Sequence, residues 1–235
     1  MPGDSLGDRM KRYENAFRHY LPSRMPVIVR VDGRSFHTLT RHCERPWDNG
    51  LRFAMDQTAV ALAEEVEGAV LAYVQSDEIS LLLHNYKTLQ TQPFFDNNLQ
   101  KLVSITAAIA SSRFTVGSRS VCGAIVPVQF DSRAFILPES EVANYFLWRQ
   151  RDAERNSIQM LARSLYSHTE LLGKGTSELQ DMCMAKGKNW NDVETSWKRG
   201  RCVLRDANGV FHVDNEIPRF GADRAYVESH LKVEE

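Results

Sequence analysis

A pair of adjacent acids, Asp77-Glu78, is placed between two apolar segments that have the composition of β-strands. Residues 70–74 read Val-Leu-Ala-Tyr-Val and residues 79–83 read Ile-Ser-Leu-Leu-Leu. Two strands joined by so short a polar turn predict a β-hairpin that carries both carboxylates at its tip. Carboxylates at a strand tip are held rigidly and are accessible to solvent. Oxygen ligands of this kind bind hard divalent cations such as Mg²⁺.

A second acid follows an earlier candidate strand. Residues 27–31 read Val-Ile-Val-Arg-Val and run directly into Asp32-Gly33. A strand that ends in Asp-Gly, together with a hairpin that carries Asp-Glu, resembles the metal site of a polymerase palm, where two carboxylates from neighbouring strands bridge two Mg²⁺ ions. Each signal alone is also typical of a simple turn or of a solvated acidic pair. The two together favour a metal site.

The remaining pattern predicts an α+β fold. Apolar residues at helical spacing predict helices over residues 5–20, 51–66 and 99–112, and strands are expected at 26–31, 70–74, 79–83, 121–128 and 134–137, with a turn at 130–133. The order β-α-β-β-α-β is that of the ferredoxin-like split arrangement, on which polymerase palms are built. We therefore expect residues 1–140 to form a palm-like catalytic core with an antiparallel sheet.

Residues 141–235 are expected to form a helical extension packed on this core. A long helix is predicted through residues 145–165. Its polar segment at 149–156 either projects charge into a cleft or emerges into solvent. Three further features are predicted: a break at residues 173–175, a short helix at 177–186, and a hairpin over 203–213 that turns at Asn208-Gly209.

Composition excludes several classes of protein. The 43% apolar and 25% charged residues are ordinary for a soluble globular protein. No apolar run approaches the about 20 residues of a membrane span, and the first residues carry no secretory signal. The four cysteines are scattered without Cys-x-x-Cys spacing, which argues against a zinc knuckle or a disulfide framework and fits a reducing cytoplasm.

The net charge of −1 does not indicate a general nucleic-acid binder. A local basic patch at residues 198–205 could still bind RNA, and a solvated charge run is the other interpretation of that segment.

Four motifs taken together resemble the tRNA(His) guanylyltransferase family: Arg30-Val31-Asp32-Gly33-Arg34-Ser35-Phe36-His37, Tyr73-Val74-Gln75-Ser76-Asp77-Glu78-Ile79-Ser80, Phe130-Asp131-Ser132-Arg133 and Trp148-Arg149-Gln150. Their order and spacing match across nearly the whole chain. The C-terminal part is more similar to the bacterial and archaeal guanylyltransferase-like branch. The eukaryotic branch has a His at the position of Glu154, and has Asn at the positions of Asn156, Ser157 and Met160.

The resemblance implies a nucleotidyltransferase that extends the 5′ end of tRNA, so that the strand grows 3′→5′. ATP first adenylylates the 5′-phosphate, and the 3′-OH of GTP or another nucleoside triphosphate then displaces AMP. Both steps are phosphoryl transfers assisted by two Mg²⁺ ions. The guanylyltransferase-like branch copies the opposite strand and repairs 5′-truncated tRNAs. The resemblance therefore implies 5′-truncated tRNAs or histidine tRNA as the RNA substrate. The resemblance also suggests a homotetramer.

The expected site follows from the resemblance and from the two strand ends. Asp32 and Asp77 are expected to bridge the metal ions, with the carbonyl oxygen of Gly33 as a further ligand. Glu78 is expected to be a catalytic carboxylate that either binds metal or supports the site, because adjacent strand residues face opposite ways. His37 is expected to contact a nucleotide and not zinc, since no second His lies at ligand spacing.

Two larger sets complete the expected site. Nucleotide contacts are expected from Arg30, Gly33, Arg34, Ser35, Phe36, His37, Arg45, Asp48, Ser76 and Asn156, with the backbone N–H groups of residues 34–37 forming an anion nest. Contacts to tRNA or to phosphate are expected from Arg133, Arg149, Arg155, Lys188, Lys198, Arg199 and Arg201.

Two other functions fit parts of the pattern. A nucleotide cyclase or diguanylate cyclase would use the same metal pair without a tRNA surface, and a non-catalytic RNA-binding module would need no carboxylates. The intact carboxylates argue against the second alternative. The charged segment 149–156 and the basic segment 198–205 argue against the first.

Overall fold

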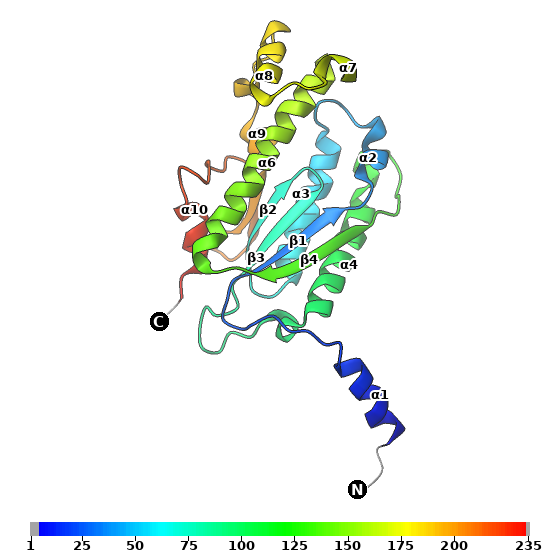
Figure 1. Ribbon diagram of the computed structural model, residues 1–235, viewed down its shortest axis with the longest axis vertical. Helices are drawn as coiled ribbons and strands as arrows, with labels where there is room; N and C mark the ends of the chain where they lie inside the picture. The colour runs from blue at the N-terminus through cyan, green and yellow to red at the C-terminus, as the bar shows by residue number, and fades with distance from the viewer. Residues whose placement is uncertain (1–4, 234–235) are drawn as a thin grey trace.

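One antiparallel sheet organises the molecule. The computed structural model describes residues 5–233, and its strands follow the order β4-β1-β3-β2-β5-β6. The strands are β1 (Val27–Gly33), β2 (Ala69–Gln75), β3 (Glu78–Leu83), β4 (Phe130–Ile136), β5 (Arg201–Arg205) and β6 (Phe211–Asp214). Figure 1 shows β4, β1, β3 and β2 side by side beneath the long helix α6 (Glu139–Leu165).

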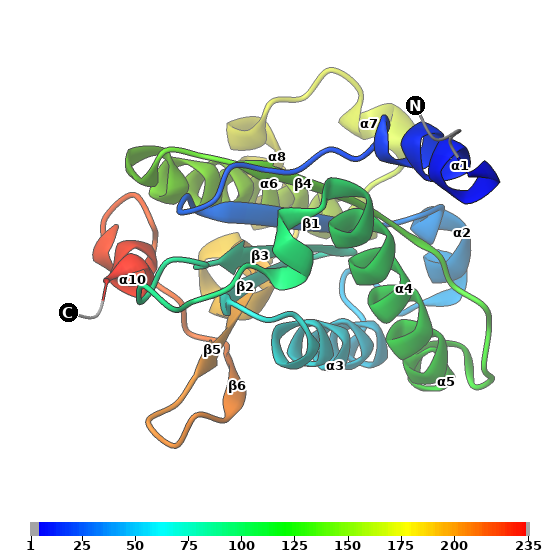
Figure 2. The same ribbon diagram turned by 90° about the horizontal axis from the view of Figure 1, so that it is seen from below.

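Helices cover both faces of this sheet. Figure 2 shows α3 (Asn49–Glu65) and α4 (Leu99–Gly117) on one side of the sheet and α6 on the other. The chain order β1-α3-β2-β3-α4-β4, with the spatial order β4-β1-β3-β2, confirms the predicted ferredoxin-like split arrangement. None of the helices within residues 5–233 is both long and apolar enough to cross a membrane.

The alternation of side chains along β1 divides the interior into two cores. Val27, Val29 and Val31 are fully buried in the core under α3 and α4. Ile28 is fully buried in the second core, under α6. Successive strand residues point to opposite faces, so the next even-numbered residues, Arg30 and Asp32, also face α6. This parity places the polar end of β1 on the α6 side.

One predicted strand is wrong. Residues 121–128 form the end of α5 (Arg119–Cys122) and an irregular segment, and β4 begins at Phe130, where the sequence predicts a turn. The amides of Val126 and Val128 donate at 2.8 and 3.0 Å to Ser118 Oγ, directly after α4, and to Thr115 Oγ1 on α4. Side chains at the end of this helix therefore satisfy these amides, and Pro127 between them has no N–H for a sheet.

The N-terminal helix is shorter than predicted. α1 (Leu6–Asn15) begins after Ser5, whose side chain accepts a hydrogen bond from the amide of Asp8 as the capping-box spacing predicts. No residue of α1 is buried, and the helix extends away from the body of the molecule (Figure 1).

The C-terminal region supplies strands as well as helices. β5 pairs with β2, and β5 and β6 confirm the predicted hairpin. Gly209 in its turn has φ +81°, which glycine adopts without strain. The remaining helices are α2 (Phe36–Leu39), α7 (His168–Leu171), α8 (Thr176–Ala185), α9 (Thr195–Arg199), α10 (Ala225–Glu228) and the 3-10 turns η1 (Thr40–His42), η2 (Phe94–Asn97), η3 (Trp190–Asp192) and η4 (Ser229–Leu231).

Candidate active site

Two acidic strand ends meet at one corner of the sheet. Asp32 on β1 lies directly opposite Glu78, the first residue of β3. The amide of Gly33 donates to the carbonyl oxygen of Asp77 over 3.0 Å and so ties the end of β1 to the β2–β3 turn. Ser76, the other residue of the turn, has φ +49°, as the residues of two-residue hairpin turns commonly do. The predicted hairpin tip is confirmed, and we call this region the acidic corner.

Both carboxylates of the acidic corner are partly withdrawn from water. Burial raises the pKa of Asp77 to about 6, and the like charge of Asp32 adds to this effect. Burial also raises the pKa of Asp32, and Asp131 on the neighbouring strand β4 contributes, while Arg30 opposes the shift. A cation between Asp32 and Asp77 would relieve their repulsion.

The oxygens of the corner fit Mg²⁺ shared with a substrate. Within residues 5–233, no group of three or more His, Cys, Asp or Glu side chains is arranged to hold a metal ion by itself. Proteins commonly hold Mg²⁺ with one or two carboxylates and leave the other positions to phosphates and water. Asp32, Asp77 and the carbonyl oxygen of Gly33 match that pattern, and they are the residues that would hold the ions.

Glycine at position 33 has a packing reason. A Cβ at Gly33 would overlap the ring of Phe36, and that ring is buried against Phe114 and Phe130 in the core. The side chain of Phe36 is therefore structural, which leaves only its backbone for the predicted nucleotide contact. The chain can turn sharply from β1 into α2 because Gly33 leaves room for this ring.

The predicted anion nest is only partly available. The amide of Arg34 donates to the carbonyl oxygen of Gln129 at 2.8 Å, and its guanidinium donates to Gln129 Oε1 at 2.7 Å. The prediction is therefore wrong for the Arg34 amide. Ser35 and His37, both exposed, line a cleft beside the acidic corner.

Both carboxylate oxygens of Glu78 accept hydrogen bonds from an arginine. Arg149 of α6 donates from Nε to Glu78 Oε1 at 2.7 Å and from Nη2 to Glu78 Oε2 at 2.6 Å. The two side chains are 8% and 9% exposed. Arg30 Nε lies 4.0 Å from the same carboxylate. Of the two roles expected for Glu78, the structure favours support of the site over metal ligation.

The predicted tRNA contact of Arg149 is not compatible with its position in the structure. Its guanidinium is buried and engaged by Glu78 and by Asp152, at 3.0 Å, so the predicted tRNA contact from this residue is wrong. The polar segment of α6 does project charge inward at Arg149, whereas Arg155 is exposed and bonded to Asp152. The inward arginine joins α6 to the strand that carries the acidic corner.

The acidic corner opens into a cleft with several basic side chains, which we call the cationic cleft. It is lined by Gly33 and Asp77 of the corner, by Ser76, by the basic side chains of His37, Arg41, Arg45 and Arg163, and by the acids Glu44 and Asp48. Arg45 and His37 are predicted nucleotide contacts. Arg41 and Arg163 are not predicted, because neither lies in a motif that the sequence analysis singled out. Basic side chains beside a metal site match the charge of a triphosphate.

A second, more apolar cleft adjoins the first, and we call it the tryptophan cleft. Trp47 and Trp197 in its lining are stacked with ring centroids 5.8 Å apart, and Arg52 lies 5.1 Å from the Trp197 ring. Asn156 also lines it, whereas Asp48, Leu51, Ser76 and Met160 line both clefts. A flat heterocycle in this cleft would lie beside a phosphate chain in the cationic cleft.

Asp48 between the clefts has a structural role. One carboxylate oxygen accepts from the amide of Leu51 at 2.8 Å and caps α3, and the other accepts from the amide of Glu44 at 2.9 Å. The carboxylate thus holds the segment that carries Arg45 and Trp47.

The predicted basic patch is not continuous on the surface. Arg201 is 3% exposed and forms an ion pair with Asp56, so its predicted tRNA contact is wrong. Lys198 and Arg199 are half-buried, and Lys198 Nζ donates to the carbonyl oxygen of Asn191. Lys188 is exposed and lines neither cleft.

On β4, Arg133 lies close to Asp131, and both side chains are exposed. Asp131, which the sequence predicts to lie in a turn, is directly opposite Asp32 of the acidic corner.

Comparisons with known proteins agree with this geometry. A family model described as tRNAHis guanylyltransferase matches residues 7–138. A solved bacterial tRNA(His) guanylyltransferase-like protein in complex with ATP is 47% identical, with a TM-score of 0.93, over 97% of this chain and 99% of that chain. A second, in complex with GTP, is 43% identical, with a TM-score of 0.84 and the same coverage. The probable tRNA(His) guanylyltransferase of Drosophila melanogaster is 27% identical over 76% of this chain and 66% of its own length.

Proposed function

The chain belongs to the tRNAHis guanylyltransferase family and is a nucleotidyltransferase, and from this premise we propose that it adds nucleotides to the 5′ end of tRNA under the direction of the opposite strand. The natural substrates of this proposal are 5′-truncated tRNAs. The homotetramer and the cytoplasmic location expected from the sequence remain predictions.

The observation that carries the proposal is the juxtaposition of the acidic corner with two adjoining clefts. Asp77 lines the cationic cleft, and Ser76 beside it lines both clefts. A nucleoside triphosphate needs an aromatic or apolar pocket for its base, cations for its phosphates and carboxylates for the metal that accompanies them. The solved relatives in complex with ATP and GTP support nucleotides as ligands of these clefts.

The side chains divide the work of binding. Trp47 and Trp197 would take up the base and exclude water. Arg41, Arg45 and Arg163 would neutralise the phosphates and hold the reacting phosphorus near Asp32 and Asp77. Mg²⁺ ions bound by these two carboxylates would stabilise charge on the transferring phosphoryl group and lower the pKa of the attacking hydroxyl.

The proposed reaction has two phosphoryl transfers. A 5′-phosphate oxygen of the RNA attacks the α-phosphorus of ATP, and pyrophosphate leaves. The 3′-OH of the incoming nucleotide then attacks the adenylylated 5′-phosphorus, and AMP leaves. The new 5′ end carries the triphosphate of the added nucleotide, so a 5′-triphosphorylated RNA should need no ATP.

Template direction is supported by the positions where the chain departs from the histidine-tRNA branch. Ser157 and Met160 line the tryptophan cleft. The hydroxyl of Ser157 is already bonded to the carbonyl oxygens of Glu154 and Lys198 and to the indole of Trp190. Glu154 lines neither cleft. The cleft therefore offers fewer protein groups that could recognise one particular base. Base pairing with the opposite strand would then select which nucleotide is added.

The test uses a tRNA with a labelled 5′-monophosphate that lacks its first nucleotide. With ATP and Mg²⁺ alone, an adenylylated 5′ end should accumulate, and adding the nucleotide complementary to the opposite base should convert it to a product one residue longer. Asp77→Asn should abolish both products. Asp181→Asn, at an exposed acid on α8, is the matched control and should retain both. Cyclisation of the nucleotide without RNA, or full turnover by Asp77→Asn, would refute the proposal.

A further inference from the structure

A third concave surface lies on α6 and takes no part in the two clefts. Trp148, Arg151 and Arg155 line it from α6, Thr176 and Gln180 from α8, and Arg219 from the segment before α10. It shares no lining residue with the cationic or tryptophan clefts. We call it the α6 hollow.

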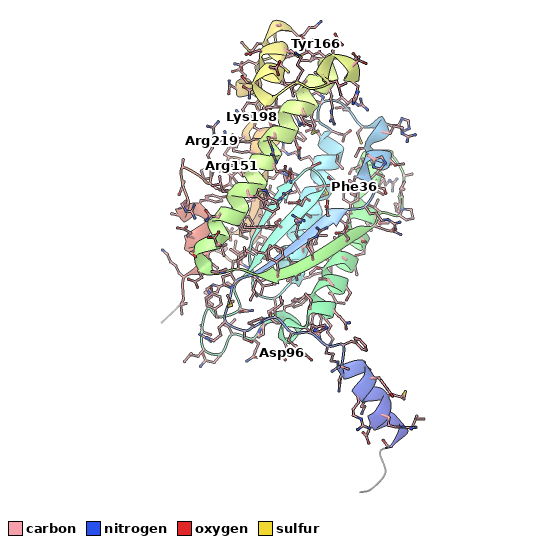
Figure 3. The ribbon with its side chains drawn as sticks, viewed as in Figure 1. Phe36, Asp96, Arg151, Tyr166, Lys198 and Arg219 are labelled. Carbon is pink, nitrogen blue, oxygen red and sulfur yellow. The ribbon has the colours of Figure 1, made fainter. Side chains whose placement is uncertain are left out.

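The hollow presents three arginines, one of which has no partner. Arg151 is exposed and has no hydrogen-bond or ion-pair partner among residues 5–233. Arg155 and Arg219 are 60% and 61% exposed; Arg155 is paired with Asp152 at 2.6 Å, and Arg219 lies 3.8 Å from Glu154, which also lines the hollow. Figure 3 shows Arg151, Arg219 and Lys198 along the same flank of α6. Exposed arginines gathered around a concave surface attract phosphodiesters.

Trp148 gives this surface an aromatic element. Its side chain is half-exposed, so part of the ring is free to contact a ligand. Exposed aromatic rings beside arginines bind single-stranded nucleic acid, because each unpaired base can stack on them.

Trp148 also connects the hollow to the acidic corner. Arg149 and Arg30 lie 4.5 and 5.9 Å from the Trp148 ring. Arg149 holds Glu78, the strand neighbour of Asp32. A strand that passes over Trp148 would therefore leave the acidic corner and enter the α6 hollow.

We propose that the α6 hollow binds the unpaired 3′ nucleotides that extend past the 5′ end under reaction. This inference rests on the proposed function. When a 5′ end of a tRNA acceptor stem lies at the acidic corner, the opposite strand continues beyond it as a single strand. Bases inside a duplex are stacked on one another and are not free to stack on Trp148, so the hollow fits the unpaired tail and not the stem.

The test measures binding in the absence of nucleoside triphosphates. Two labelled RNA hairpins share one acceptor-stem duplex, and only one of them carries a four-nucleotide 3′ tail. For the unmodified protein, the tail should tighten binding about tenfold, as expected for base stacking on one aromatic ring together with a phosphate contact. Trp148→Ala should remove most of that gain and leave the affinity for the blunt hairpin unchanged. Trp148→Phe should retain it.

The cationic part is tested separately. Arg151→Ala should weaken binding of the tailed RNA and lower its salt dependence by about one unit of slope. Lys174→Ala is the matched control, because Lys174 is an exposed cation outside the hollow and should affect neither RNA.

Several outcomes would overturn the inference. Equal binding of both hairpins by the unmodified protein would do so. An equal loss for both hairpins in Trp148→Ala would mean a structural role for Trp148. Displacement of the tailed RNA by a polyglutamate peptide as effectively as by a single-stranded tetranucleotide would indicate an acidic protein as the partner.

The proposed function can fail independently. If binding depends on the tail but no nucleotide is ever added, the reaction is refuted and the hollow stands. If nucleotides are added with the same KM to tailed and blunt hairpins, the proposed reaction stands and the role of the hollow is refuted.

Discussion

The ion pair between Arg149 and Glu78 should be the interaction that fixes α6 onto the strand of the acidic corner. Replacing Arg149 by Met removes two charge-assisted hydrogen bonds of 2.7 and 2.6 Å and leaves the buried Glu78 carboxylate without its partner. Breaking a buried pair in this way costs about 3–5 kcal/mol. Arg30 at 4.0 Å compensates in part, so we expect the lower end of that range, about 3 kcal/mol.

A double-mutant cycle in urea unfolding measures this coupling. In a chain of 235 residues, the loss in Arg149→Met should lower Tm by about 6–12 °C. Glu78→Gln combined with Arg149→Met should lose much less than the sum of the two single variants, with a coupling energy of about 2 kcal/mol. Effects of the two substitutions that add to within about 0.5 kcal/mol would show that Arg149 and Glu78 do not stabilise each other. Arg113→Met is the matched control, since the pair of Arg113 with Glu65 is exposed and should contribute no more than about 1 kcal/mol.

Four further outcomes are expected. Asp32→Asn and Asp77→Asn should each lower turnover at least about 1000-fold, because both phosphoryl transfers depend on the same ions; near-normal turnover in saturating Mg²⁺ would show that these residues are not the ligands. In metal-free buffer, Asp77→Asn should leave stability unchanged below about pH 4, where the carboxyl is protonated in both states, and should raise it progressively as pH passes the folded-state pKa of about 6; a stabilisation that is equal at pH 4 and pH 8 would contradict this sign. Millimolar Mg²⁺ should raise the Tm of the unmodified protein and not that of Asp77→Asn, and an equal shift in both would place the ion elsewhere. Gly33→Ala should cost about 1–3 kcal/mol in urea unfolding through overlap with the Phe36 ring, whereas Gly7→Ala on α1, where a Cβ would lie at an ordinary contact distance of 3.7 Å from Ser5 Oγ, should cost nothing measurable.

The hairpin of β2 and β3 was predictable because both strands are short, apolar and joined by two polar residues. β3 is buried along its whole length and β2 along nearly all of it, so a continuous apolar run was the correct signal. The second half of β4 was predicted as a strand at residues 134–137, but its first half was missed because Phe130-Asp131-Ser132-Arg133 contains the polar residues of a turn. β4 is an edge strand whose alternate residues face solvent, and edge strands tolerate such residues.

The acidic corner was predictable because Asp32 lies at the end of one strand, and Asp77 in the turn between two others, that the sequence identifies. The buried ion pairs that support this corner could not be predicted from the sequence. Arg149 and Glu78 are 71 residues apart, and Arg201 and Asp56 are 145 apart, so nothing in local sequence distinguishes these buried arginines from exposed ones. The tryptophan cleft depends likewise on the stacking of Trp47 with Trp197, a contact that only the tertiary fold creates.

We propose that pairing with the opposite strand selects the added nucleotide. The most direct test is kcat/KM for addition to a tRNA that lacks its first nucleotide, measured with each of the four bases opposite the gap and each of the four nucleoside triphosphates. We expect the complementary nucleotide to be preferred in every case, by about 5- to 150-fold, given a mismatch cost of about 1–3 kcal/mol. We also expect full-length histidine tRNA with A at that position to be a poor acceptor of G. A tenfold preference for G whatever the opposing base would contradict the claim.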